Sequence, residues 1–205
     1  MIALKILEHH PLHISLSKPF LVLFFPWCLA VHASDAVDFK SQTLTLALTQ
    51  EPPQLNSAKA TDQVSGMVLG HLMQGLVRYD RRGNVIPGVA ERWKMDEKTA
   101  IFWLREDAKW SDGKSVTAHD FVFAWQRVVD PKTASEYAFI LAPIKNAAEI
   151  NEGKLPVTQL GAVALDDRTL QVTLARPTAY FVKLTVFITF YPIRQDFFES
   201  RGDQY

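Results

Sequence analysis

The chain has 205 residues, of which 48% are hydrophobic and 21% are charged. This composition suits a globular protein with a sizeable core and excludes a disordered one. Its 22 basic and 22 acidic residues balance, so no strong electrostatic field favours nucleic acid as a partner. Cys28 is the single cysteine, which excludes a disulfide within the chain and a thiolate metal cluster.

The first 33 residues have the features of an export signal. Lys18 precedes the apolar run from Phe20 to Val31, and about a dozen apolar residues are too few to span a bilayer as a helix. Small residues at Val31 and Ala33 stand where a signal peptidase cleaves. We therefore predict a secretory signal peptide over residues 1–33. Cys28 is not expected to carry a lipid, because the bulky Trp27 precedes it.

Two elements are predicted early in the remaining chain. Thr43 to Thr49 alternates leucine with threonine and alanine, which predicts a half-buried strand that ends before Pro52. Thr61 and Asp62 can cap a helix, which we expect to run from Gln63 to about Leu76.

The stretch from Ile101 to Val129 predicts a strand, a tight turn and a helix in quick succession. Residues 101–104 suit a strand, which pairs with residues 93–95 in a hairpin. Thr117 is a good N-cap, and Asp120 stands where the acid of a capping box would lie. The apolar residues of the helix share one face that must pack on a sheet, namely Phe121, Trp125 and Val128.

Three further segments complete the expected α/β organisation. Residues 133–141 suggest a short helix, and residues 162–165 and 169–174 suggest two strands joined by a turn at Asp166–Arg168. The strongly apolar segment Tyr180 to Phe190 is compatible with a helix followed by a strand.

The sequence carries no pattern of catalytic residues. His71 and His119 have no metal-ligand spacing, and neither a nucleophile elbow nor a Gly-rich phosphate loop is present. Asp166 and Asp167 fit a solvated turn better than a catalytic pair. We therefore predict a protein that is not an enzyme and that needs no cofactor or metal. An exported hydrolase is the alternative, and it would need a nucleophile and base that are not evident.

Tyr137 is the aromatic residue with the strongest claim to a binding role. Trp93, Trp103 and Trp125 recur at strand or helix spacing, which favours positions in the core. Tyr137 instead lies in a segment with small and polar flanks, and its hydroxyl needs a partner if it is buried.

Six segments form an ordered set of motifs: Pro87–Trp93, Phe102–Gly113, Val116–Val122, Ala124–Arg127, Val129–Ala138 and Leu160–Leu170. Together they resemble the signature of the family 5 solute-binding proteins, the extracytoplasmic receptors of peptide and nickel ABC importers. The resemblance extends from Thr43 to Tyr205, and its later motifs are similar to the oligopeptide-binding branch.

This resemblance implies a type II periplasmic-binding-protein-like α/β fold. Residues 34–205 would form the N-terminal lobe with an inserted subdomain, while the second lobe would be missing. Peptide would be held between two lobes in an extended form by main-chain hydrogen bonds. The implied peptide-binding residues are Thr61, Asp62, Gln63 and Tyr137. The first three replace a Glu-Gly-Val run of the oligopeptide receptors, so peptide length and register stay open.

The resemblance also implies the partners and the location. We expect a periplasmic monomer that delivers peptide to a cognate ABC permease in the inner membrane. Without a second lobe to close over the ligand, the chain alone is expected to bind peptide weakly or not at all. A receptor for nickel or another solute, and a non-functional remnant, are the alternatives within the family.

Overall fold

A computed structural model describes residues 37–45 and 47–202. The predicted signal peptide, residues 1–33, lies outside the described residues. The chain divides into two units, residues 1–51 and 52–205. In the first unit, β1 (Val37–Asp38) pairs antiparallel with β2 (Thr43–Leu44). The strand predicted from Thr43 to Thr49 is thus shorter than expected, because a partner of two residues offers no further ladder hydrogen bonds.

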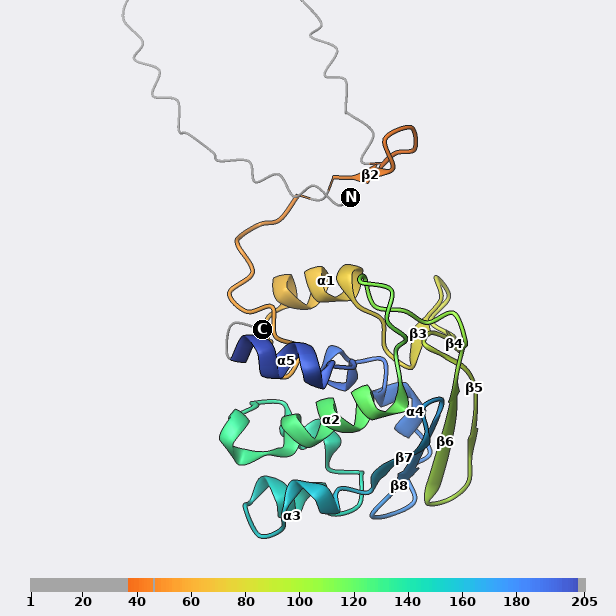
Figure 1. Cartoon of the computed structure of the whole chain (residues 1–205), viewed down its shortest axis with the longest axis vertical. Helices are drawn as coiled ribbons and strands as arrows, with labels where there is room; N and C mark the ends of the chain where they lie inside the picture. The colour runs from red at the N-terminus through yellow and green to blue at the C-terminus, as the bar shows by residue number, and fades with distance from the viewer. Residues whose placement is uncertain (1–36, 46, 203–205) are drawn as a thin grey trace, which may run out of the picture. The chain divides into compact units, whose positions relative to one another are not determined.

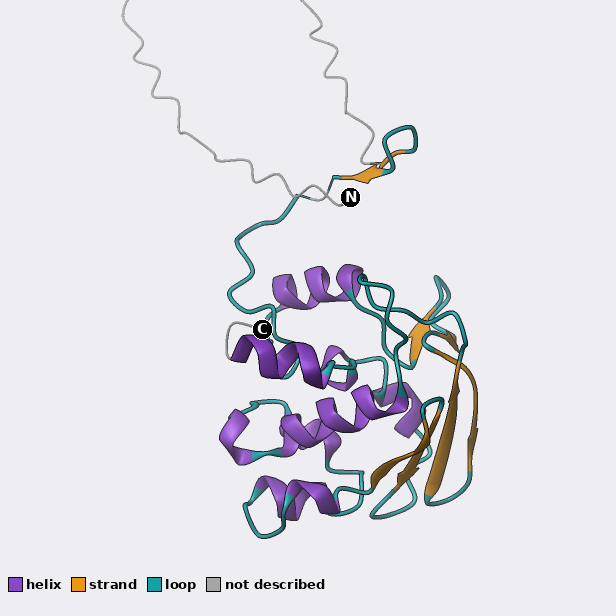
Figure 2. Ribbon diagram, viewed as in Figure 1, coloured by secondary structure: helices purple, strands orange, loops and turns teal. Residues whose placement is uncertain are grey.

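The second unit is built on a four-stranded antiparallel sheet (Figures 1 and 2). Its strands are β5 (Ala90–Met95), β6 (Thr99–Leu104), β7 (Ala162–Asp166) and β8 (Thr169–Thr173), in the order β5-β6-β8-β7. Both predicted hairpins are confirmed. Burial alternates along β6, where Ala100, Phe102 and Leu104 turn one face of the sheet toward the core.

Helix α2 (Ala118–Val129) covers that face and packs against β7 and β8 (Figure 1). The predicted capping box is present, with the Thr117 backbone N–H donating to Asp120 Oδ2 at 2.8 Å. The Thr117 hydroxyl also donates to Asp120 Oδ2, at 3.2 Å. Trp125 is fully buried, and its Nε1–H donates to the Phe190 carbonyl at 2.9 Å. The predicted apolar face of the helix is therefore the centre of the core.

Shorter elements surround this centre. They are α1 (Gln63–Leu72), β3 (Val77–Tyr79), β4 (Val85–Pro87), η1 (Pro131–Thr133), η2 (Ala138–Leu141), α3 (Ala147–Asn151), η3 (Val157–Gln159), α4 (Phe181–Leu184), η4 (Ile188–Phe190) and α5 (Gln195–Arg201). Strands β3 and β4 form a separate antiparallel pair. Among the described residues, no helix is long and apolar enough to cross a membrane.

Three predicted elements differ from the structure. Helix α1 ends at Leu72 rather than about Leu76, because Met73 turns to an extended backbone. The helix predicted over residues 133–141 is two 3-10 turns, because Ala134 adopts a left-handed conformation with φ 52° between them. The segment Tyr180 to Phe190 forms helix α4 and then the 3-10 turn η4 instead of a strand, and this arrangement buries both Phe181 and Phe190.

Close backbone packing joins the segment between α1 and β3 to the start of β5. Gly88 N–H donates to the Leu76 carbonyl at 3.1 Å, and Arg105 Nε–H donates to the Gly88 carbonyl at 3.0 Å. A Cβ at position 88 would lie 2.5 Å from the Gly75 carbonyl oxygen. The approach therefore requires glycine at this motif position.

An ionic network joins the turn at residues 110–114 to the start of α5. Arg194 pairs with Asp112 at 2.5 Å and with Asp196 at 2.6 Å, and Lys114 pairs with Asp196 at 2.6 Å. The hydrogen bond from Arg194 lowers the pKa of Asp112, and the hydrogen bond from Lys114 lowers the pKa of Asp196. This network keeps the turn and α5 together on the outside of the core.

Candidate functional site

All four predicted site residues line one pocket of about 500 Å³. Thr61, Asp62 and Gln63 form the entry to α1, and Tyr137 comes from the segment between η1 and η2. Ala60 and Gly66 flank residues 61–63, and two other segments complete the walls with Tyr79, Val186, Phe187 and Ile188. Residues that are widely separated in the sequence thus meet at this pocket.

The entry to α1 is fixed by helix capping. The Asp62 carboxylate accepts a hydrogen bond from the Ser65 backbone N–H at 2.8 Å, as an N-cap does. Hydrogen bonds from the Ser65 side chain and backbone lower the pKa of Asp62, so its carboxylate is ionised at neutral pH. The preceding loop is also fixed, because Asn56 accepts hydrogen bonds from the backbone N–H groups of Ala58 and Ala60. The pocket therefore has one edge of defined backbone carrying a negative charge.

Tyr137 is held at the pocket by its hydroxyl. The hydroxyl donates to the Thr61 carbonyl at 3.2 Å, which gives it the partner that the sequence required. The Tyr137 ring meets the Phe139 ring edge to face, with centroids 5.9 Å apart. On the N-terminal side, Asp130 caps η1 by accepting from the Lys132 backbone N–H at 3.0 Å. Tyr137 thus connects the loop before α1 to the 3-10 segment and fixes both relative to the pocket.

Four apolar lining residues were not predicted from the sequence: Tyr79, Val186, Phe187 and Ile188. The side chains of Tyr79 and Phe187 are 46% and 51% exposed. The apolar segment Tyr180 to Phe190 predicted a helix followed by a strand, and its spacing does not separate the buried Phe190 from the exposed Phe187. A signal was available in Tyr79, because it is an aromatic residue at the end of a short strand beside a polar turn.

The lining suits binding better than catalysis. Of the described residues that line it, Asp62 is the one acidic side chain, and none is a lysine, arginine or histidine. Within the described part of the chain, no group of three or more histidine, cysteine, aspartate or glutamate residues could hold a metal ion. The pocket offers apolar walls, a tyrosine ring and main-chain polar groups.

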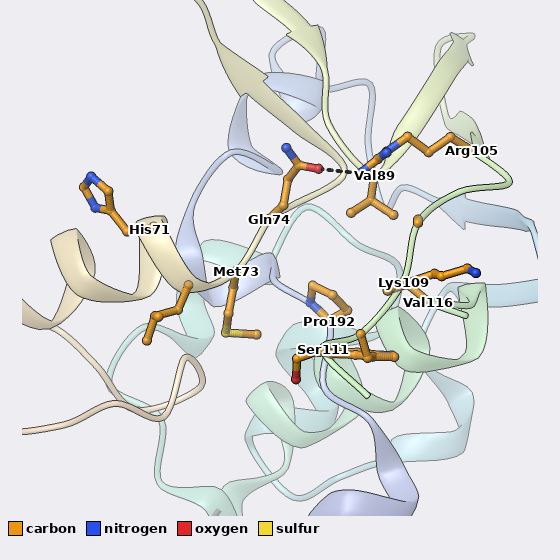
Figure 3. A pocket seen from close by; sticks show the side chains of 13 residues that line it. His71, Met73, Gln74, Val89, Arg105, Lys109, Ser111, Val116 and Pro192 are labelled. Atoms are coloured by element: carbon orange, nitrogen blue, oxygen red, sulfur yellow. Dashed lines mark hydrogen bonds between the residues drawn. The ribbon is translucent and has the colours of Figure 1, made fainter. Parts of the chain in front are cut away.

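A second pocket, of about 460 Å³, lies between the end of α1 and residues 105–111 (Figure 3). Arg105 dominates one side, where its Nη2–H donates to Gln74 Oε1 at 3.2 Å. Its Nε–H donates to the Gly88 carbonyl, and its Nη1 pairs with Asp107 at 2.9 Å. The guanidinium is therefore engaged in holding local structure, and none of the four predicted site residues lines this pocket.

Comparison with known families decides the class of protein. Residues 84–204, more than half of the chain, match the family described as "Bacterial extracellular solute-binding proteins, family 5 Middle". The chain belongs to this family. Family 5 proteins bind solutes and are not enzymes, which confirms the non-catalytic prediction. The predicted resemblance is also confirmed.

Two curated family 5 relatives are similar to most of the chain. The periplasmic murein peptide-binding protein MppA of Escherichia coli is 42% identical over 170 residues, which are 82% of this chain and 32% of that protein. The periplasmic oligopeptide-binding protein OppA of Salmonella typhimurium is 45% identical over 167 residues, which are 80% of this chain and 31% of that protein. The chain thus spans about a third of the length of these relatives.

A solved structure shares the arrangement of elements. The substrate-binding domain of an oligopeptide ABC transporter from Bacillus anthracis matches with a TM-score of 0.76 and 49% identity. The match covers 77% of this chain and 31% of that one. The fold is therefore a mixed α/β fragment that corresponds to part of an oligopeptide-type substrate-binding protein.

Proposed function

We propose that the chain acts in peptide import, as part of the periplasmic substrate-binding component of an ABC-type oligopeptide importer. The supporting observation is that Thr61, Asp62, Gln63 and Tyr137 line a single pocket. The chain is also 42% and 45% identical to two periplasmic proteins named for binding murein peptide and oligopeptide.

In this proposal, residues 34–205 supply the N-terminal part of a type II binding protein with an inserted subdomain. The peptide lies extended along the entry to α1, where main-chain groups of residues 61–63 hydrogen-bond to it as an added strand would. The Tyr137 ring forms an adjacent wall, and its hydroxyl keeps the loop in place. A monomer of the complete receptor would present the closed form to its permease.

The residues of this chain form one wall of the proposed binding site, and one wall alone gives limited affinity for a peptide. The second lobe of such a receptor closes over its ligand and excludes water. Residues 34–205, tested by themselves, would leave one side of the peptide solvated. We therefore expect this chain alone to bind peptides more weakly than a micromolar Kd. Calorimetry with di- to pentapeptides tests this expectation, and micromolar or tighter binding would contradict it.

The location of binding can be measured by NMR. Titration of the ¹⁵N-labelled chain with tripeptides to about 10 mM, the range in which millimolar complexes are detected, is expected to shift the amide signals of Thr61, Asp62 and Gln63. Tyr137→Ala is expected to reduce these shifts. Tyr180→Ala is the control, because it removes an exposed tyrosine ring that does not line the pocket. Unchanged amide signals throughout the titration would rule out the proposed site.

A further inference from the structure

The composition of the pocket beside Tyr137 has a consequence for ligand choice. We propose that this pocket selects a bulky apolar side chain of the peptide, aromatic or branched aliphatic, and discriminates against an acidic one. The inference rests on the proposed function, because it specifies the class of peptide that the same site would take.

Apolar groups form most of the pocket wall. Val186, Phe187 and Ile188 are consecutive residues just beyond the C-cap of α4, and Tyr79 contributes from β3. The side chains of Phe187 and Tyr79 are about half exposed in this chain, so a ligand can remove their surface from water. An exposed apolar surface that gathers in a concave site is typical of a ligand pocket.

The space is sufficient for a large side chain. Ligand pockets in proteins commonly enclose about 300–1,000 Å³, and this pocket encloses about 500 Å³. Gly66 contributes to the room, because a Cβ at that position would already lie 3.9 Å from Ile188 Cδ1. A methyl group there would face the apolar wall and narrow the pocket on the α1 side.

The negative charge of Asp62 is the reason to expect discrimination against an acidic side chain. Asp62 lies at the same pocket, and its hydrogen bonds with Ser65 keep it ionised at neutral pH. Among the described residues that line the pocket, none carries a cationic side chain to balance that carboxylate. An acidic peptide side chain would meet a like charge and an apolar surface together, which disfavours its binding. A lysine side chain could lay its stem on the apolar wall and direct its ammonium to Asp62, so it should rank between the two.

Single blocked amino acids test this selection without requiring a second lobe. We would titrate the chain, labelled at isoleucine and valine methyl groups, with N-acetylated amides of phenylalanine, leucine, lysine and glutamate. The methyl signals of Ile188 and Val186 are expected to shift with phenylalanine and leucine at concentrations at least tenfold lower than with glutamate. Equal binding of the phenylalanine and glutamate compounds would overturn the proposal.

Two variants test whether the preference for an apolar side chain comes from Phe187 and the discrimination against an acidic one from Asp62. Phe187→Ser is expected to weaken the binding of the phenylalanine compound about fivefold or more, whereas Asp62→Asn should bring glutamate closer to phenylalanine. Leu165→Ser is the matched control, because Leu165 on β7 is similarly exposed, at 55%, and does not line the pocket. An equal loss in Phe187→Ser and Leu165→Ser would also overturn the proposal.

Tripeptides separate this inference from the proposed function. Ala-Phe-Ala and Ala-Glu-Ala would be titrated while the amide signals of Thr61, Asp62 and Gln63 are followed. If both tripeptides bind equally well, the selection fails and the peptide-binding function stands. If neither binds but the blocked amides are still discriminated, the selection stands and the function of this chain in peptide binding fails.

Discussion

The α2–sheet core and the Tyr137 pocket are built in opposite ways. In the core, Phe102 and Trp125 are fully buried, and Trp125 also donates a hydrogen bond to the Phe190 carbonyl. In the pocket, Tyr79 and Phe187 are about half exposed and come from distant parts of the chain. The motifs that identify the family thus lie mainly in the scaffold, whereas the residues that face a ligand are few and scattered. Substitutions should separate stability from binding along the same division.

Removing Trp125 should have the largest effect on stability. Trp125→Ala leaves a cavity, ends the edge-to-face contacts with Phe121 and Phe190, and leaves the Phe190 carbonyl without its donor. We expect the free energy of unfolding to fall by about 3–5 kcal/mol. Urea denaturation measures this change. Phe187→Ala is the comparison from the pocket, and its half-exposed side chain should change stability by less than about 1 kcal/mol. Similar losses in both variants would remove the distinction between the two regions.

Gly88→Ala should have the next largest effect. The added methyl group would meet the Gly75 carbonyl oxygen at 2.5 Å, so the backbone must move and the hydrogen bonds around Gly88 must weaken. We expect a loss of about 2–4 kcal/mol in the free energy of unfolding, measured by thermal or urea denaturation.

The matched control is Gly70→Ala in α1. A Cβ at position 70 would meet nothing within 4 Å. Alanine is the better helix former, so this variant should gain up to about 1 kcal/mol. A neutral Gly88→Ala would show that the approach of β5 to the segment between α1 and β3 is not constrained as described.

The ionic network around Arg194 predicts a smaller effect, which depends on pH. The pKa values of Asp112 and Asp196 are lowered, so their contribution is present above the ordinary aspartate value of 3.8 and is lost as pH falls through the lowered values. Asp120 has the opposite sign, because burial raises its pKa and its ionised form opposes folding as pH rises. Asp112→Asn should therefore be less stable than the unaltered chain at pH 7, and the difference should shrink below pH 3.8.

Denaturation midpoints between pH 3 and pH 7 measure this difference, within the range where carboxylates titrate. Asp96→Asn is a suitable control, because it removes one negative charge from an exposed turn whose ion pair with Lys94 is longer, at 3.9 Å. A difference between Asp112→Asn and the unaltered chain that stays constant across this range would argue against the network.

The sequence predicted the scaffold because local patterns and tertiary packing agree there. The alternation in β6, the capping box of Thr117 and Asp120, and the apolar face of α2 all point to one arrangement, which the structure confirms. The segment at residues 133–141 was predicted wrongly, because the left-handed backbone of Ala134 divides it into two turns. Nothing in the local sequence around Ala134 predicts a left-handed backbone at an alanine.

The pocket was predictable only in part. The family resemblance supplied residues 61–63 and Tyr137, and the structure brings all four together. The apolar wall at Phe187 was missed, because hydrophobicity alone does not tell a buried side chain from one that faces a cavity. The roles of residues 61–63 and Tyr137 as ligand contacts remain predictions, which the titrations above would test.

The order of strands in the sheet also has a consequence for how the chain folds. Strand β6 pairs on one side with its neighbour in sequence, β5, and on the other with β8, where Thr99 meets Thr173. During synthesis the β5–β6 hairpin forms early, but one hydrogen-bonding edge of β6 stays open until β8 has been made. Such a non-local pairing slows folding, and an open edge can recruit another chain. We therefore expect completion of the sheet by β8 to limit the folding rate, and nascent chains that end before residue 169 to aggregate.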